Sequence, residues 1–128
     1  MLVLGSIVTL RDCGNPTTDQ AVIVSKGFSP DNPLPGENTT LWIAYDLKTP
    51  ITGGTAIYSA TLNGIPFTPI EYDLCSQTFC PKDVASYNET SNSDFPTGLN
   101  GKVVSKIQWK NQNNEPIWCL ESTFKINE

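Results

Sequence analysis

The chain has 128 residues, with 8 Lys and Arg, 13 Asp and Glu, and no His, which gives a formal net charge of -5. This length suits a single domain over residues 1–128 that buries most of its apolar surface in one core. The acidic balance argues against a nucleic-acid partner, because such proteins present a basic surface. No stretch of the sequence approaches the roughly 20 apolar residues that span a bilayer.

The first part of the chain predicts strands and not helices. Ten prolines and nine glycines interrupt the sequence, and no segment sustains apolar spacing of three and four. The apolar residues 1–10 lack a basic region and a cleavage site, so we interpret them as a truncated or added end. That end runs into a first strand predicted over Ser6 to Asp12. A second strand is predicted over Gln20 to Phe28, and the turn-forming run Ser29 to Gly36 ends it.

The middle of the chain alternates apolar and polar residues more clearly. The strand predicted over Thr39 to Lys48 has one dry face, formed by Leu41, Ile43, Tyr45 and Leu47. Gly53-Gly54 then turns the chain into a strand predicted over Thr55 to Leu62. Asn63-Gly64 is a strong hairpin signal and predicts a return over Ile65 to Leu74.

The last third of the chain begins with a polar segment. Lys82 to Asn100 predicts a loop with one short strand around Val84 to Tyr87 and a bend over Phe95 to Gly98, so few of its residues are expected to anchor a core. The alternation resumes over Gly101 to Lys110 and over Ile117 to Ile126. Seven or eight short antiparallel strands, with turns roughly every eight to twelve residues, predict an all-β sandwich or a small barrel.

The four cysteines indicate disulfides. No CxxC or Cys-His pairing occurs, so neither zinc binding nor thioredoxin-type redox chemistry is expected, nor any other metal site. The four cysteines fit a protein of an oxidising compartment, where they form disulfides, better than a metal-binding or redox protein. Four cysteines allow three connectivities, of which the simplest pairs Cys75 with Cys80 and Cys13 with Cys119. Glycosylation sequons at Asn38 and Asn88 agree with secretion.

Four short motifs occur in a characteristic order: Asp12-Cys13-Gly14, Phe28-Ser29-Pro30, Cys75 to Cys80-Pro81, and Trp118-Cys119. Across nearly the whole chain this order resembles the ML lipid-recognition family, which includes Niemann-Pick type C sterol carriers and phosphatidylglycerol/phosphatidylinositol transfer proteins. The resemblance implies an immunoglobulin-like β-sandwich whose sheets part to admit a lipid, with Cys13–Cys119 and Cys75–Cys80 disulfides. Sterol carriers usually hold a third disulfide between the second and third strands, and residues 25–37 here contain no cysteine. This departure favours the phospholipid-transfer branch.

A lipid cavity needs an apolar lining around roughly 300 to 1,000 Å³ and few polar groups for the headgroup. Inward positions of the predicted strands supply that lining: Ile43, Tyr45, Tyr58, Ile107, Trp109, Trp118, Leu120 and Phe124. We expect Phe67 and Phe95 at the pocket mouth, because each lies in a proline-bearing segment, and we expect Tyr87 to offer its hydroxyl to a headgroup. The lining residues fit a closed core as well, and Phe67, Phe95 and Tyr87 fit a lid over such a core.

Three lysines, Lys102, Lys106 and Lys110, recur every four residues on the outward face of one predicted strand. The plainer interpretation is a solvated or edge-protecting face. The alternative is a membrane-docking stripe, because each cation near an anionic membrane adds about 1 kcal/mol.

The sequence therefore predicts a monomeric carrier, secreted or in the endolysosomal lumen, that binds a phosphoglycerolipid or sterol and makes transient membrane contact. No cofactor besides the bound lipid is expected. Catalysis is disfavoured because the chain has no histidine, although Glu71 and Asp73 fit a carboxylate pair on one strand face. The alternative function is an adhesion or receptor-binding module without lipid carriage, because immunoglobulin-like sandwiches often bind proteins through their loops.

Overall fold

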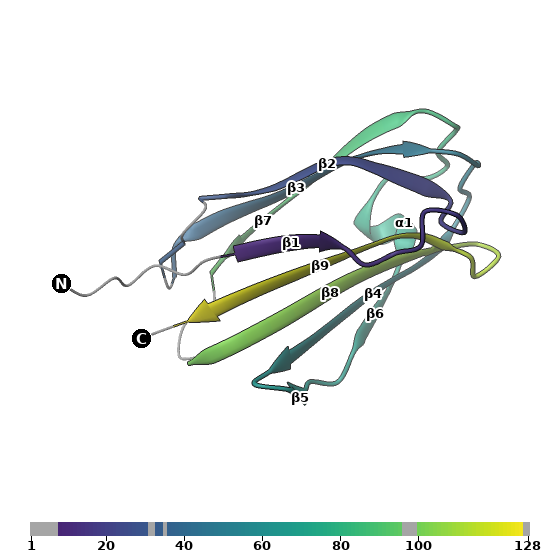
Figure 1. Ribbon diagram of the computed structural model, residues 1–128. Coiled ribbons are helices and arrows are strands. Elements are labelled where there is room, and N and C mark those ends of the chain that lie inside the picture. Colours follow the sequence, from purple (N-terminus) through teal and green to yellow (C-terminus); the bar gives the residue numbers. More distant parts are fainter. Residues whose placement is uncertain (1–7, 31–32, 35, 96–99, 127–128) are drawn as a thin grey trace.

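The computed structural model describes residues 8–30, 33–34, 36–95 and 100–126. In chain order its elements are β1 (Val8–Asp12), β2 (Ala21–Ser29), β3 (Asn38–Leu47), β4 (Gly54–Leu62), β5 (Ile65–Pro66), β6 (Ile70–Asp73), α1 (Leu74–Gln77), β7 (Ser86–Asp94), β8 (Gly101–Asn111) and β9 (Pro116–Ile126). The strands form two antiparallel sheets that face each other as two layers (Figure 1). The predicted all-β sandwich is therefore confirmed. Within the described residues, no helix has the length and apolar character needed to cross a bilayer.

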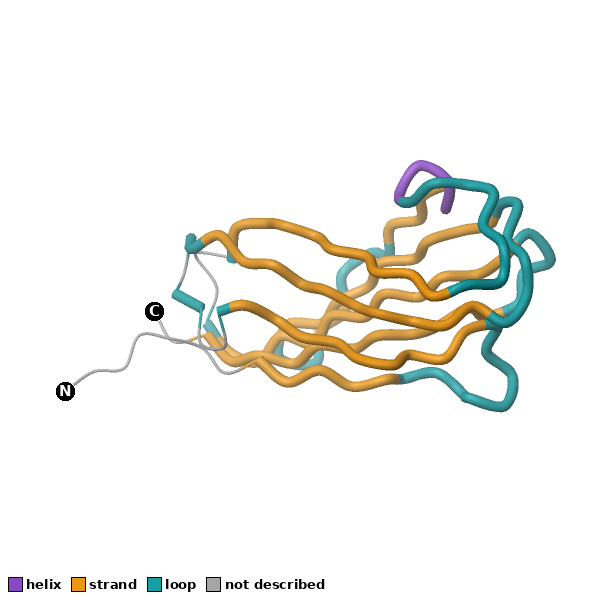
Figure 2. The backbone as a smooth tube through the Cα atoms, turned by 90° about the horizontal axis from the view of Figure 1, so that it is seen from above, coloured by secondary structure: helices purple, strands orange, loops and turns teal. Residues whose placement is uncertain are grey.

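The larger sheet has the strand order β1-β9-β8-β4, and both β5 and β6 pair with the free side of β4. Its registers place Tyr58, Ile107 and Leu120 in one row facing the smaller sheet. The smaller sheet has the order β2-β3-β7. Strands of both sheets run along the same long axis, and α1 lies at one end of the molecule (Figure 2).

Apolar packing fills the space between the sheets in two places. The larger cluster surrounds Trp109 and Trp118, whose ring centroids lie 4.5 Å apart. Its other buried members are Ala21, Ile43, Tyr45, Leu47, Ile51, Ala56, Leu74, Ile117 and Leu120. The smaller cluster is built on buried Phe95 and Val103, against which Phe28, Leu62 and Phe124 pack.

Between these two clusters the larger sheet presents small side chains to the interior. Ala60, Ser105 and Ser122 lie directly opposite one another on β4, β8 and β9. We call these three residues the small-residue row. None of the three is buried, although each lies on the inner face of a sheet. Because these three side chains are small, they fill less of the space between the sheets than the aromatic residues of the clusters on either side.

Both disulfides of the simplest pairing are present, and no cysteine is free. Cys13–Cys119 joins the end of β1 to β9, its neighbour in the same sheet, and the Cys13 N–H donates to the Cys119 carbonyl at 3.1 Å. Cys75–Cys80 closes the turn at α1, in the connection between β6 and β7. Neither disulfide ties a strand of one sheet to a strand of the other.

The prediction of a loop over Lys82 to Asn100 with a short strand at Val84 to Tyr87 is wrong. The structure instead contains the nine-residue strand β7, which pairs with β3 along its whole length. Backbone hydrogen bonds hold this strand, and its side chains are polar on both faces apart from Tyr87. It therefore lacks the apolar alternation that marks a strand in a sequence.

The predicted return over Ile65 to Leu74 forms in two pieces, and Leu74 itself begins α1. The Asn63-Gly64 hairpin is present, with φ of 51° and 84° at its two residues. After it, residues 67–69 separate β5 from β6. The Phe67 N–H still donates to the Ala60 carbonyl at 2.9 Å, whereas Pro69 has no N–H to donate. Because this return forms two strands, β5 and β6, the described residues contain nine strands, where seven or eight were predicted.

Candidate functional site

A cavity of about 140 Å³ lies between the two sheets. Its floor is apolar and comes from β3, β4, β8 and β9, through Leu41, Ile43, Tyr58, Ile107, Trp109, Trp118 and Leu120. Its rim is polar and comes from α1 and β7, through Gln77, Glu89, Thr90 and Ser91. An apolar floor with a polar rim suits an amphipathic molecule.

Strand β7 explains why the cavity is open on one side. Glu89 lies opposite Ile43 and Ser91 lies opposite Leu41, so both polar residues face the interior. A strand that closed a solid core would carry apolar residues at these positions. Among the described residues, β2 comes within 8 Å of β1 and β9 between Cα atoms, and β7 comes that close to no strand of the larger sheet. The sandwich is therefore closed along β1 and β9 and open on the opposite side, between β7 and the edge that β5 and β6 form beside β4.

Tyr45 forms the inner wall behind the cavity. Its ring centroid lies 6.3 Å from that of Trp109, 6.2 Å from that of Trp118 and 5.8 Å from that of Tyr87. Its hydroxyl donates to Glu89 Oε2 at 2.9 Å. Burial, and then the nearby Glu89 charge, raise the pKa of Tyr45 well above its ordinary value. The hydroxyl therefore stays protonated and keeps its hydrogen bond across the physiological pH range.

A buried ion pair lies beside this wall. Lys82 Nζ is 3.4 Å from Glu89 Oε2, and the Lys82 side chain has no exposed surface. The ammonium lies over the Phe79 ring at 3.4 Å and over the Tyr87 ring at 4.3 Å from the centroids. Thr78 also donates to both Glu89 oxygens, at 3.1 and 3.2 Å. Glu89 is thus held by three different side chains.

Tyr58 and Gln77 form the opposite side of the rim. The Tyr58 hydroxyl donates to Gln77 Oε1 at 3.1 Å. Burial raises the pKa of Tyr58, so this hydroxyl also remains a neutral donor at physiological pH. The indole N–H of Trp118 is buried and has no hydrogen-bond partner among the residues that the structure describes.

The structure brings together six of the residues predicted to line a lipid cavity: Ile43, Tyr58, Ile107, Trp109, Trp118 and Leu120. Tyr45 lies behind them. Phe95 and Phe124, with ring centroids 4.9 Å apart, belong to the smaller cluster and not to a mouth. The Tyr87 hydroxyl donates to the Asp83 carbonyl at 2.7 Å, so its hydrogen is already used and its oxygen remains an acceptor.

Phe67 lies in a different hollow, on the outer face of the larger sheet. This groove has a volume of about 560 Å³ and is lined by Ser59, Ala60, Thr61, Pro66, Phe67, Thr68, Pro69, Val104, Lys106 and Glu121. Its floor is a single sheet, and among the described residues no second sheet covers it. Although this groove is larger than the cavity between the sheets, it cannot enclose an acyl chain.

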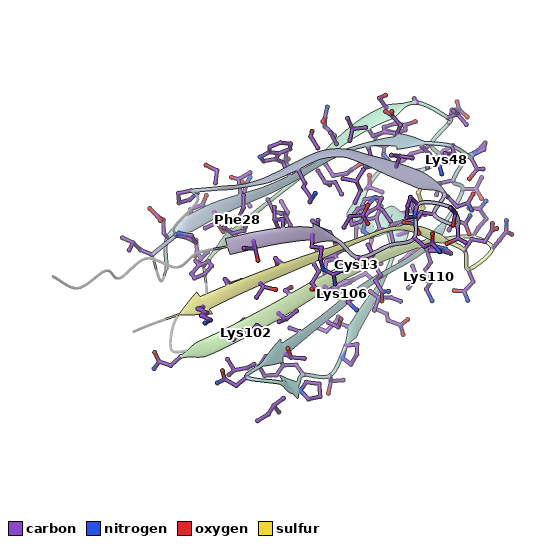
Figure 3. The ribbon with its side chains drawn as sticks, viewed as in Figure 1. Cys13, Phe28, Lys48, Lys102, Lys106 and Lys110 are labelled. Atoms are coloured by element: carbon purple, nitrogen blue, oxygen red, sulfur yellow. A yellow bond between two sulfur atoms is a disulfide. The ribbon has the colours of Figure 1, made fainter. Side chains whose placement is uncertain are left out.

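The three lysines of the predicted stripe follow one another along β8 (Figure 3). Their surroundings differ. Lys106 lies opposite Glu121, which also pairs with Arg11 at 3.0 Å, whereas Lys102 lies opposite Lys125. Positive charge therefore accumulates at the Lys102 end of the strand.

The remaining predicted positions lie on outer surfaces. Asn38 and Asn88 are exposed on the smaller sheet. Glu71 and Asp73 are exposed on β6, opposite Ile57 and Thr55, and so they face away from the cavity.

The sequence of residues 7–126 matches the profile of the ML domain family. The chain belongs to the ML domain family. Two putative phosphatidylglycerol/phosphatidylinositol transfer proteins of Dictyostelium discoideum, numbers 1 and 3, are 27% and 26% identical to it over 125 residues, which cover 94% of this chain and 82% of each relative. The resemblance predicted from the cysteine and proline motifs is confirmed.

Solved structures of similar fold include a Niemann-Pick type C2 protein from Japanese carpenter ant, with a TM-score of 0.69, 13% identity, and coverage of 90% of this chain and 96% of that one. Chicken MD-1 complexed with lipid IVa gives a TM-score of 0.65 and 16% identity, covering 96% of this ML chain and 91% of MD-1. At such low identity these similarities show the fold alone. They confirm the immunoglobulin-like form of the ML sandwich.

Sequence reasoning missed the polar residues of this ML cavity, namely Gln77, Glu89, Thr90 and Ser91, and the buried Lys82 that pairs with Glu89. The one available signal is that Tyr87, Glu89, Ser91 and Ser93 share a parity, which would place them on one face of a strand. Without an apolar partner residue, this parity does not indicate which face is inward.

Proposed function

We propose that this ML domain binds one amphipathic lipid between its sheets and transfers it between membranes. The observation that carries the proposal is the cavity itself, with an apolar floor and a polar rim, open between β7 and the β5 and β6 edge of the larger sheet. The names of the Dictyostelium relatives, as phosphatidylglycerol/phosphatidylinositol transfer proteins, support a phosphoglycerolipid ligand. A sterol is the second ligand class that this apolar floor suits.

The cavity must widen to hold a whole lipid, because 140 Å³ lies below the roughly 300 Å³ of small ligand sites. The small-residue row supplies the direction of widening. Ser105 is two residues from Ile107 on the inner face of β8, which is about 7 Å along a strand. No disulfide joins strands across the open side, so the sheets are free to part there.

The proposed setting is a secreted or endolysosomal one. Both disulfides favour an oxidising compartment. The protein would act there as a monomer that touches membranes briefly, without a catalytic step. Burying lipid surface is favourable by about 25 cal/mol per Å², so a few hundred Å² of chain gives useful affinity without specific polar contacts.

Filling the small-residue row tests this proposal. Ser105→Phe places a ring between the sheets, so we expect lipid uptake from vesicles to fall about tenfold or more, with no loss of thermal stability, since the neighbouring Ala60 and Ser122 side chains are small. Uptake is measured on delipidated protein by native mass spectrometry of the bound lipid.

The matched control is Val104→Phe, the neighbouring position on the outer face of β8, which lines the outer groove. This variant is expected to take up lipid like the parent. Loss of uptake in Val104→Phe alone would move the ligand to the outer groove. A parent protein that takes up no lipid would favour the adhesion module instead.

Membrane docking through β8 is a second prediction. Reversing Lys102, Lys106 and Lys110 to Glu is expected to slow transfer to anionic vesicles, because each cation near the surface contributes about 1 kcal/mol. Ligand affinity should not change, since the three side chains lie on the outer face of the larger sheet. Transfer rates to anionic and neutral vesicles are compared by fluorescence; an equal slowing on both surfaces excludes a docking stripe.

A further inference from the structure

The outer groove is a hollow of about 560 Å³ that the proposed lipid carriage does not use. Its wall is the segment 66–69, and its floor is the outer face of β4, β8 and β9. The floor side chains are Ser59 and Thr61 from β4, Val104 and Lys106 from β8, and Glu121 from β9. The volume lies within the roughly 300 to 1,000 Å³ of small-molecule sites. A groove over a single sheet suits a short, compact ligand better than a long chain.

The wall of the outer groove is held against β4. The Phe67 N–H donates to the Ala60 carbonyl at 2.9 Å. Pro66 and Pro69 flank Phe67 and Thr68, and each proline ring fixes its own backbone φ to about −65°. Phe67 itself is 50% exposed. A half-exposed aromatic ring on a restrained segment gives a ligand ring a flat surface to pack on, with little entropy lost on binding.

Lys106 is the cation on the groove floor. It lies opposite Ser59 on β4 and opposite Glu121 on β9. Among the described residues its ammonium makes no hydrogen bond and no ion pair. The Glu121 carboxylate pairs with Arg11 instead, at 3.0 Å. The Lys106 ammonium is therefore available to a ligand anion.

The outer face of the larger sheet is positive, although the whole chain has a net charge of -5. The described strands carry five cations and three carboxylates on this face, which gives it a net charge of +2. The cations are Arg11, Lys102, Lys106, Lys110 and Lys125, and the carboxylates are Glu71, Asp73 and Glu121. A hollow within such a local excess of positive charge attracts anions.

We propose that the outer groove binds an aromatic carboxylate, with the ligand ring against Phe67 and the ligand carboxylate paired with Lys106. Both the site and the ligand are separate from the cavity and the lipid of the proposed function. Val104 adds apolar surface for the ring, and the Ser59 and Thr61 hydroxyls on the same floor are donors for the carboxylate. A neutral ring of the same shape packs against Phe67 but forms no ion pair. An alkyl chain leaves much of its surface in water, because only one sheet lies beneath it.

The test offers delipidated wild-type protein two probes of the same shape, the anion 2-naphthoate and its neutral analogue 2-naphthamide. Binding is followed by NMR titration of isotopically labelled protein, which also shows which backbone amides the probe approaches. We expect 2-naphthoate to bind about tenfold more tightly, the effect of one interaction with a charged group. The amide signals of Phe67, Thr68 and Lys106 should shift. Equal affinity of the two probes, no binding, or shifts confined to the cavity between the sheets overturns the inference.

A pair of lysine variants assigns the anion to Lys106. Lys106→Met is expected to remove the preference for 2-naphthoate over 2-naphthamide. Lys110→Met removes a cation from the same face of β8, outside the groove lining, and should keep the preference. A Lys106→Met variant with the wild-type preference excludes Lys106 as the partner of the carboxylate.

A pair of phenylalanine variants separates the groove from the lipid cavity. Val104→Phe fills the outer groove and is expected to weaken the binding of both probes about tenfold. Ser105→Phe, on the inner face of β8, should leave probe binding unchanged while it blocks lipid uptake. Loss of probe binding in Ser105→Phe alone places the probe between the sheets and overturns the inference. Wild-type protein that binds 2-naphthoate but takes up no lipid contradicts the proposed function alone.

Discussion

Replacing Cys13 and Cys119 together with alanine is expected to lower the free energy of unfolding by about 5 kcal/mol. The disulfide joins residues 106 positions apart, and the chain entropy that a cross-link removes from the unfolded state grows with the length of the loop. Since domains of this size are stable by roughly 5 to 15 kcal/mol, this loss removes a third or more of the stability. Urea unfolding followed by tryptophan fluorescence measures it, because Trp109 and Trp118 lie in the larger cluster.

The control is the other disulfide. Cys75 and Cys80 are five positions apart, so replacing both with alanine is expected to lower the free energy of unfolding by only about 2 kcal/mol. Each double variant loses two sulfurs, so the main difference between them is the length of the loop that the disulfide closes. Equal losses for the two pairs would contradict the entropic account.

The sequence predicts best those strands that have one dry face. The strand predicted over Thr39 to Lys48 is observed as β3, Asn38–Leu47, with Ile43, Tyr45 and Leu47 buried as expected. Its alternation reflects burial on one face of a sheet, and that burial is a property of single residues at period two. The prediction of β8 succeeds for the same reason.

Strand β7 could not be found in this way. It is an edge strand whose pairing with β3 joins residues forty or more positions apart, such as Ile43 and Glu89. Its inner face is polar because it borders the cavity, so the residues that define the rim are the same residues that hide the strand. The failure of the pattern thus coincides with the candidate site.

The lining of the cavity was predicted only in part, because period two gives the face of a strand and not the position along it. Phe124 shares its parity on β9 with Trp118 and Leu120, yet it packs in the smaller cluster at the other end. The small-residue row, which lies between the clusters, depends on the alignment of three strands and so requires the registers. Phe67 lines the outer groove from the segment between β5 and β6, a position that parity along a strand does not give.

Replacing Lys82 with methionine is expected to lower the free energy of unfolding by about 3 kcal/mol. Methionine nearly matches the volume of lysine, so the packing between Phe79 and Tyr87 is retained and the charge alone is lost. Glu89 then remains as a mostly buried carboxylate without a counter-ion, and breaking such a pair by removing one partner costs about 3 to 5 kcal/mol. The lower end of this energy range applies, because the Tyr45 and Thr78 hydroxyls still donate hydrogen bonds to Glu89.

A double-mutant cycle separates the charge from the packing in this pair. Lys82→Met with Glu89→Gln leaves no unpaired charge, so its stability in urea is expected to return to within about 1 kcal/mol of the parent. Lys102→Met, at an exposed lysine on β8, should change stability by less than about 0.5 kcal/mol. If Lys82→Met is as harmless as Lys102→Met, the ammonium does not stabilise Glu89. Glu89 would then be held by the hydroxyls of Tyr45 and Thr78 alone.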